Sequence, residues 1–285
     1  NGDPCYDIWG MDVSRFGNWA TRDYTNAKVR ENYSRRFSIR FPNEELPAAR
    51  PVQTNALYDI HLASGAVMGD SWGLEIPLWF APNGEKAEDI FSFHRSTDFP
   101  HVKAEVMNCR ENVGYSDISN FAKYTIFGPG AREWLSEVMT NFIPREGRLA
   151  LTSMTNEEGK IIGDFTVACA GPDGRQGERF QMWGSSQAQI YHMRWFKKHL
   201  PSDGSVVIEN MDLGLTGLTI AGPNAQKVLA KLTDENVSNA AFKFMDYREQ
   251  VIASVPAQIN RISYTGDLGY EIWVKPEYLR RLYLG

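Results

Sequence analysis

The stretch YTIFGPGAREWLSEV, at residues 124–138, organises this sequence, because it recurs without gaps as LTIAGPNAQKVLAKL at residues 218–232. Each copy has the pattern of a strand, a Gly-Pro turn and a helix, and the helix carries apolar residues at positions i, i+3, i+4 and i+7. A helix of this kind covers one face of a sheet. The repeat therefore predicts an α+β chain built from two related halves, each a sheet with helices on one side.

Length and composition limit the possible classes of protein. The chain has 285 residues, of which 42% are hydrophobic and 12% aromatic, and its net charge is −5. This is ample apolar material for a core, and the length favours two lobes. The nearly balanced charge provides no basic face, so we expect neither nucleic acid nor a membrane surface as a partner. No apolar run approaches the roughly 18 residues of a membrane helix.

Cysteine and histidine residues give no sign of a metal site. The three cysteines (Cys5, Cys109 and Cys169) are widely spaced and odd in number, which fits a reducing compartment better than a disulfide framework. The five histidines also lack metal-ligand spacing, and we expect no metal. His192 and His199 lie seven residues apart on a predicted helix, where we interpret them as solvent-facing or as part of a helix cap.

Regular patterning begins only after the first third of the chain. Residues 1–95 are rich in Trp, Arg and Pro and show little periodicity apart from a short helical stretch at 55–66. We expect loops wrapped on another surface there, followed by a regular domain at 96–285. The chain starts without Met or a signal-peptide pattern and ends within a predicted helix, so we expect it to be a piece of a longer protein.

Two acidic motifs are candidates for chemistry: GDFTV at residues 163–167 and YTGDLGYE at residues 264–271. In each, a carboxylate lies beside a glycine turn and an apolar strand, where it is costly unless N–H donors satisfy it. The simplest interpretations are that Asp164 accepts hydrogen bonds from turn amides and that Glu271 faces solvent. The alternative is that Asp164 faces an amine nitrogen. Glu271, on the same strand face as Trp273, would then bind a flat heterocycle that carries N–H donors.

Several motifs taken together resemble one family. RENVGYSDIS at residues 110–119, the two Gly-Pro-x-Ala repeats and the two acidic motifs resemble the folate-binding aminomethyltransferase of the glycine cleavage system. The chain is more similar still to the folate half of dimethylglycine and sarcosine dehydrogenases. FPNEE at residues 41–45 and the stretch 63–81 resemble the end of the flavin-linked portion of those enzymes. The similarity covers nearly the whole chain.

This resemblance implies a fold and an activity. The fold would be the aminomethyltransferase folate-binding fold over residues 96–285, without its C-terminal part, preceded at 1–95 by the tail of an FAD-dependent oxidoreductase domain. The activity would be oxidation of a small N-methyl amine by FAD. The iminium or formaldehyde equivalent would then be captured on tetrahydrofolate as 5,10-methylenetetrahydrofolate. We expect activity of the whole enzyme rather than of this part alone.

The resemblance also implies roles for five residues. Asp164 matches the acidic residue near the folate N10 and the one-carbon centre, and is the expected catalytic residue. Thr166 lies close by, Tyr264 and Glu271 match groups that hold the pterin, and Gly184 matches a glycine beside the cofactor ring.

The flavin is not expected on this chain. No Gly-x-Gly-x-x-Gly follows a strand here, so FAD is expected on the preceding portion, in cis or in a partner subunit. The expected location is the cytoplasm, or the mitochondrial matrix in a eukaryote. Two alternatives stay open: a stand-alone aminomethyltransferase-like enzyme with another methyl donor, and a folate-binding module without catalysis.

Overall fold

Two five-stranded antiparallel sheets form the centre of the molecule. The computed structural model describes residues 8–174 and 177–285, so Cys5 and the start of the chain lie outside the described residues. The first sheet joins, in spatial order, β5 (Leu149–Thr155), β6 (Ile161–Pro172), β7 (Glu178–Gly184), β4 (Ala122–Gly128) and β8 (Val207–Asn210). The second joins β10 (Tyr247–Ile252), β11 (Val255–Asn260), β12 (Gly269–Val274), β9 (Thr216–Ala221) and β3 (Gly114–Asp117).

The internal repeat is confirmed as a strand–turn–helix unit in each half. Strand β4 leads into α4 (Ala131–Val138), and β9 leads into α6 (Ala225–Leu229). The turn glycines Gly128 and Gly222 have φ angles of 122° and 123°. A Cβ atom would lie 2.3 Å from the Ser205 carbonyl oxygen in the first case and 2.4 Å from the Cys109 carbonyl oxygen in the second. Glycine is therefore required at both equivalent positions, by backbone conformation and by space.

The two halves exchange their edge strands. Strand β3 comes just before β4 in the chain, yet it pairs with β9 in the second sheet. Strand β8 comes just before β9, yet it pairs with β4 in the first sheet. Each sheet is thus completed by a strand that leads into the repeat of the other half. The predicted pair of related halves is confirmed, but they interlock.

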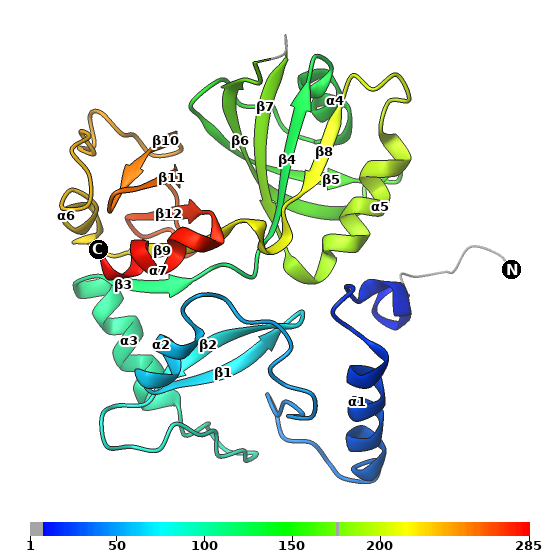
Figure 1. The fold of residues 1–285 in the computed structure, drawn as a ribbon, viewed down its shortest axis with the longest axis vertical. Helices are drawn as coiled ribbons and strands as arrows, with labels where there is room; N and C mark the ends of the chain where they lie inside the picture. Colours follow the sequence, from blue (N-terminus) through cyan, green and yellow to red (C-terminus); the bar gives the residue numbers. More distant parts are fainter. Residues whose placement is uncertain (1–7, 175–176) are drawn as a thin grey trace, which may run out of the picture.

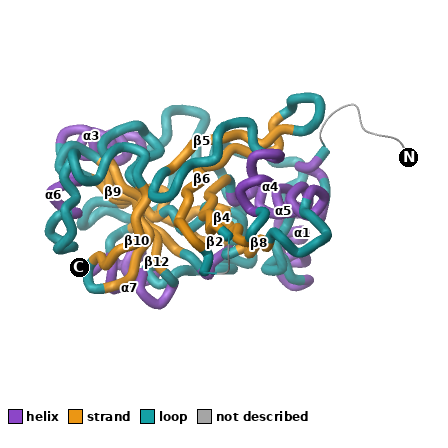
Figure 2. Tube along the Cα trace, turned by 90° about the horizontal axis from the view of Figure 1, so that it is seen from above, coloured by secondary structure: helices purple, strands orange, loops and turns teal. Residues whose placement is uncertain are grey.

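Helices cover the outer face of each sheet (Figures 1 and 2). Helices α4 and α5 (Gln189–His199) pack on the first sheet around a buried cluster that includes Trp134, Phe165 and Phe196. Helices α6 and α7 (Pro276–Leu284), together with α2 (Tyr58–Ala63), lie on the second sheet, whose cluster includes Tyr270 and Leu279. The arrangement expected for an aminomethyltransferase-like fold, sheets with helices on one side, is present in both halves.

The prediction for His192 was wrong. Its side chain is buried, because Gln189, His192 and Phe196 form the face of α5 that packs on the sheet. The Nδ1 atom of His192 lies 3.1 Å from the hydroxyl oxygen of Tyr124. Burial lowers the pKa of His192 to about 4, so the ring is neutral at physiological pH.

The inner faces of the two sheets meet in a third buried cluster. The rings of Trp183 on β7 and Trp273 on β12 stack with centroids 5.6 Å apart and an interplanar angle of 28°. Backbone hydrogen bonds also join the halves, from the Leu149 N–H to the Met245 carbonyl oxygen at 2.8 Å and from the Tyr247 N–H to the Gly147 carbonyl oxygen at 2.9 Å. The two sheets are therefore fixed relative to each other by both backbone and side-chain contacts.

Residues 8–95 lie below both sheets in the view of Figure 1. They contain α1 (Arg22–Ser34), α2 and a hairpin of β1 (Ala66–Ser71) and β2 (Leu74–Phe80), while α3 (Phe99–Glu111) follows. The sequence did not predict α1, because no side chain of this described helix is buried and it lacks an apolar stripe. Asn55 connects this segment to β3, because its side-chain amide donates a hydrogen bond to the Asp117 carboxylate at 2.6 Å. The short 3-10 helices are η1 (Trp9–Met11), η2 (Val13–Arg15), η3 (Ser186–Ala188) and η4 (Asp212–Gly214).

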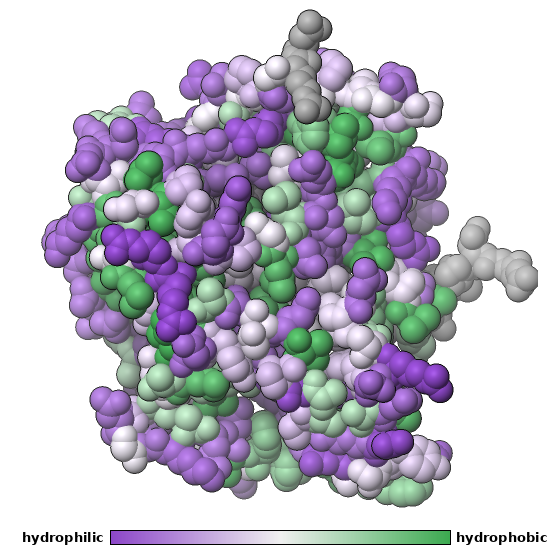
Figure 3. Space-filling view, viewed as in Figure 1, coloured by the Kyte–Doolittle hydropathy of each residue, from purple (hydrophilic) through white to green (hydrophobic). Residues whose placement is uncertain are grey.

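Within residues 8–174 and 177–285, no helix is long and apolar enough to cross a membrane. On the face shown in Figure 3, hydrophilic side chains predominate and apolar side chains form small separate groups.

The exchanged strands predict that the halves unfold as one unit. Phe196→Ala removes a fully buried ring from the first half and should lower the free energy of unfolding by about 3–5 kcal/mol. We expect hydrogen-exchange protection to fall equally in β6 and in β12. The control Val29→Ala, at an exposed position of α1, should change neither strand. Unchanged protection of β12 in Phe196→Ala would show that the halves unfold separately.

Candidate functional site

Both predicted acidic residues lie on the inner faces of the sheets. On β6, Phe165 points to the helix-covered side, so Asp164 and Thr166 point to the side that faces the second sheet. On β12, Glu271 and Trp273 occupy the inner face, while the alternating apolar residues Tyr270, Ile272 and Val274 pack under the helices. The predicted alternation of β12 is confirmed.

A pair of tryptophans connects the two acidic positions. Thr166, two residues from Asp164, is in register with Trp183 on β7. Trp183 stacks on Trp273, which lies two residues from Glu271. Along this path, packed indole rings separate the carboxylates, and each carboxylate has its own hydrogen-bond partner.

Asp164, at the β6 end of this series of contacts, is exposed to solvent. Its carboxylate accepts a hydrogen bond from the Ser153 hydroxyl, at 3.3 Å, from the opposite position on β5. An exposed carboxylate on a rigid strand can orient a ligand amine and accept or hold a proton.

Gly184 has a packing reason to be glycine. A Cβ atom there would lie 2.8 Å from the Phe165 ring, on the helix-covered side of the first sheet. At Gly163 a Cβ atom would lie 2.5 Å from the same ring and 2.8 Å from Nε2 of His192. The two glycines thus allow Phe165 and His192 to pack directly behind Asp164. Any contact of Gly184 with a ligand on the inner face would involve its backbone.

Glu271 is buried rather than solvent-facing, so the simplest interpretation of its strand was wrong. Only 6% of the residue is exposed, and its Oε2 accepts a hydrogen bond from Nδ2 of Asn260 at 3.1 Å. Burial raises the pKa of Glu271, and the hydrogen bond from Asn260 opposes that rise. The nearby indole N–H of Trp273 favours the charged form slightly, although its geometry falls short of a hydrogen bond.

Unpaired polar atoms gather around Glu271. Strand register places Asn260, Glu271 and Thr219 side by side on β11, β12 and β9, and places Gln258 beside Trp273 in the next row. Several buried polar atoms on these inner faces have no hydrogen-bond partner in the described part of the chain: Oγ1 of Thr219, Oε1 of Gln258, Oδ1 of Asn260 and the indole nitrogens of Trp183 and Trp273. Each such atom costs about 1–3 kcal/mol when unsatisfied, so these atoms call for partners, such as water or a polar ligand, that the described chain does not supply.

Sequence reasoning missed Asn260, Gln258 and Thr219. The signal was present, because polar side chains alternate with apolar ones on β11 and β9, but the partner strand could not be identified from the sequence.

Tyr264 lies apart from Glu271. It is 91% exposed in the turn at residues 261–268, which connects β11 to β12. The structure does not pack its ring on the other expected pterin-binding residues, so its role stays a prediction.

Lys123 is another residue that the sequence did not reveal. It is 2% exposed on the inner face of β4, in register with Trp183, and its Nζ donates to the Ser119 carbonyl oxygen at 2.6 Å. The Nζ atom lies 5.9 Å from the ring centroid of Trp273. Burial lowers the pKa of Lys123 to about 7, against the opposing charges of Asp212 and Asp117.

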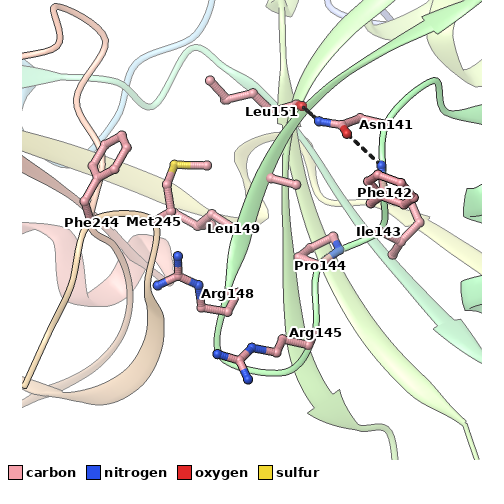
Figure 4. A pocket seen from close by; sticks show the side chains of 11 residues that line it. Asn141, Phe142, Ile143, Pro144, Arg145, Arg148, Leu149, Leu151, Phe244 and Met245 are labelled. Carbon is pink, nitrogen blue, oxygen red and sulfur yellow. Dashed lines mark hydrogen bonds between the residues drawn. The ribbon is translucent and has the colours of Figure 1, made fainter.

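A cavity of about 530 Å³ opens beside β5 (Figure 4). Leu149 and Leu151 line it from the inner face of β5, and Leu151 is in register with Thr166 on β6. Phe244 lies opposite, and Arg145 and Arg148 border the cavity. Arg148 is paired with Asp246, whereas Arg145 is exposed and has no ion-pair partner among the described residues.

The remaining lining residues of this cavity are Asn141, Phe142, Ile143, Pro144, Ala150 and Met245. Among residues 8–174 and 177–285, no group of three or more His, Cys, Asp or Glu side chains could hold a metal ion.

The low pKa of Lys123 predicts a pH-dependent stability difference. Between about pH 7 and the usual lysine pKa of about 10.4, the unfolded chain binds a proton that the folded chain does not. Stability from this residue therefore rises with pH across that window. Urea unfolding compares the free energy of unfolding of Lys123→Met with that of wild type. We expect this difference to favour the variant most near pH 6.5 and to decline by pH 9.5. The exposed control Lys227→Met should show no such trend. A pH-independent difference for Lys123→Met would contradict the assignment.

Comparisons with known proteins agree with this architecture. The chain is 35% identical to mitochondrial dimethylglycine dehydrogenase from Rattus norvegicus, covering 99% of this chain and 33% of that protein. The protein of the same name from Homo sapiens is 34% identical, with 99% and 32% covered. The chain thus spans about a third of the length of these curated relatives. The crystal structure of glycine cleavage system aminomethyltransferase T from Bartonella henselae has the same fold, with a TM-score of 0.64 and 22% identity over 81% of this chain and 56% of that chain.

Family models divide the chain between two descriptions. Residues 1–54 match the FAD dependent oxidoreductase central domain, and residues 57–284 match the GCVT N-terminal domain. The second match covers most of the chain, including both sheets and all the inner-face residues described above. The chain therefore belongs to the GCVT N-terminal domain family.

Proposed function

We propose that this chain provides the tetrahydrofolate-dependent one-carbon transfer part of an N-methyl amino acid dehydrogenase of the dimethylglycine or sarcosine type. Family membership and the similarity to dimethylglycine dehydrogenases over nearly the whole chain support this proposal. The observation that carries it is the buried carboxylate of Glu271 among unpaired polar atoms, on inner faces that also present Asp164.

The residues around Glu271 fit a reduced pterin. Its pyrimidine ring is flat and carries adjacent N–H donors along one edge and a carbonyl oxygen. Glu271 and Oδ1 of Asn260 are acceptors for the donors, and the indole nitrogens of Trp183 and Trp273 are donors for oxygen or ring nitrogen. A buried carboxylate matched to N–H donors discriminates strongly, because a ligand without those donors leaves the charge unpaired.

Asp164 is proposed as the catalytic residue. Tetrahydrofolate, when bound, supplies the amine nitrogens that take up the one-carbon unit. Asp164 orients the nitrogen and balances the positive charge that develops as the carbon–nitrogen bond forms. Ser153 holds the carboxylate from β5. The stacked tryptophans limit water on the side toward Glu271.

Thr166, Gly184 and Tyr264 complete the proposed cofactor-binding set. Thr166 shares the inner face with Asp164, Gly184 contributes through its backbone, and exposed Tyr264 is available to contact the pterin from the β11–β12 turn.

The amine oxidation is assigned to a flavin domain outside this chain. We propose that FAD binds that domain, in cis or as a partner subunit, and that the amine is a small N-methyl amino acid. The match of residues 1–54 to an oxidoreductase domain supports contact with it. We propose that residues 1–95 form its tail and a linker, within which the GCVT N-terminal domain match begins at residue 57, and that residues 96–285 form the folate domain, with the boundary in the loop between β2 and α3. The proposed location is the mitochondrial matrix in a eukaryote, since the relatives' names include the word mitochondrial, and otherwise the cytoplasm.

Two substitutions should separate folate binding from transfer in the full-length enzyme. Glu271→Gln should weaken 5-formyltetrahydrofolate binding by roughly 10- to 100-fold, because a charge-assisted hydrogen bond is lost. Asp164→Asn should keep most binding but slow methylene transfer by about 10² to 10⁴-fold, equivalent to about 3–5 kcal/mol in the barrier. Titration calorimetry and single-turnover transfer measure the two effects, and flavin reduction should be unchanged in both variants.

Glu277→Gln, on the exposed side of α7, is the matched control and should behave as wild type. Equal affinity of all variants for 5-formyltetrahydrofolate would reject the pocket. Normal binding by a wild-type enzyme that shows no transfer would support a folate-binding module without catalysis.

The cavity beside β5 is proposed to take the aminobenzoyl-glutamate arm of the folate. Its apolar walls suit the benzoyl ring, and Arg145, which has no ion-pair partner among the described residues, offers its positive charge to the carboxylates. Arg145→Glu should weaken binding of 5-formyltetrahydrofolate by about 5-fold or more, since an exposed attraction becomes a repulsion. A tetrahydropterin without the arm should bind equally to both proteins. The exposed α3 control Arg110→Glu should have no effect. An equal loss for both ligands in Arg145→Glu would contradict this placement.

A further inference from the structure

Asn260 is an unusual residue for its position. It ends β11 directly opposite Glu271, is 0% exposed, and lies next to the fully buried Ile259. Its Nδ2 donates to Glu271, but its Oδ1 is buried and has no hydrogen-bond partner in the described chain. Asparagine is disfavoured in strands, and a buried carbonyl without a donor is costly, so the Asn260 Oδ1 needs a partner that the described chain does not supply.

The charge on Glu271 fixes how the Asn260 amide is turned. An ionised carboxylate only accepts hydrogen bonds, so the NH₂ group of Asn260 must face it. Because the amide is planar, its carbonyl oxygen is then directed away from Glu271. The pair presents a carboxylate and a neighbouring carbonyl as fixed acceptors on one inner face.

We propose that Asn260 is a positioning and specificity residue. It turns the Glu271 carboxylate toward the ligand and adds its own carbonyl to the acceptors that recognise a 2-amino-4-oxo-pyrimidine edge. This inference rests on the function proposed above and names the ligand edge that is recognised. A pterin offers adjacent N–H donors there. A lumazine has a carbonyl oxygen in place of the 2-amino group, and this acceptor would face the acceptor oxygens of Glu271 and Asn260.

The surroundings of Glu271 make this role measurable. Its row neighbours are Asn260 on β11, Thr219 on β9 and, one strand further, Ser116 on β3, with Trp273 along its own strand. The titratable group that faces Trp273 is Lys123, whose Nζ lies 5.9 Å from the ring centroid. Among the described residues, no charged side chain contributes to the pKa of Glu271, which burial raises and Asn260 and Trp273 lower. Removing Asn260 should therefore raise that pKa further. Protonated Glu271 cannot accept from a ligand N–H as a carboxylate does, so folate affinity should fall as the pH drops through it.

The experiment measures 5-formyltetrahydrofolate affinity from pH 5.5 to 8.5 in the full-length enzyme. Asn260→Leu should weaken binding about tenfold or more at pH 8. It should also move the midpoint of the pH-dependent loss to higher pH, and should reduce the preference for a tetrahydropterin over the matching tetrahydrolumazine. The matched control is Gln250→Leu, on the neighbouring strand β10, where the side chain contacts Thr233 rather than Glu271. It should leave the pH midpoint unchanged.

Asn260→Asp provides a second variant of the same shape, in case the leucine variant does not fold. A second carboxylate beside Glu271 should move the pH midpoint up as well. An unmoved midpoint and an unchanged pterin preference in folded variants would overturn the role of Asn260. If wild type fails to bind the folate at any pH, the proposed function itself fails. If Glu271→Gln loses binding while Asn260→Leu retains both affinity and midpoint, only the inference about Asn260 fails.

Discussion

The stacking of Trp183 on Trp273 is the contact on which the rest of the arrangement depends. It joins the inner faces of two sheets whose edge strands are exchanged, so neither sheet is positioned independently of the other. Gly217 makes the contact possible, because a Cβ atom there would lie 2.4 Å from the Trp273 ring. This close approach fixes the two inner faces relative to each other. The inner face of the second sheet carries Glu271, and that of the first sheet carries Asp164.

The two acidic residues differ in environment, and this difference suits different roles. Glu271 is buried, has a raised pKa and lies among unpaired polar atoms, as expected for a group that recognises a specific ring. Asp164 is exposed and backed by Phe165 and His192, which suits a group that handles charge during transfer.

The sequence predicted those features that depend on local periodicity. The strand–turn–helix repeat and the placement of Glu271 with Trp273 both follow from spacing along one segment, and both are present. The burial of Asn260 and Lys123 and the exchange of β3 and β8 were not predictable, because they depend on which distant strand pairs with which. Helix α1 was missed for a different reason, since it buries no side chain along its described length.

The most direct test of the account is a structure of the full-length enzyme with 5-formyltetrahydrofolate bound. The account predicts the amino edge of the pterin within hydrogen-bond distance of Glu271 and the Asn260 carbonyl, with the one-carbon centre beside Asp164. A pterin bound elsewhere, or inner faces around Glu271 that stay closed while folate binds with full affinity, would contradict it.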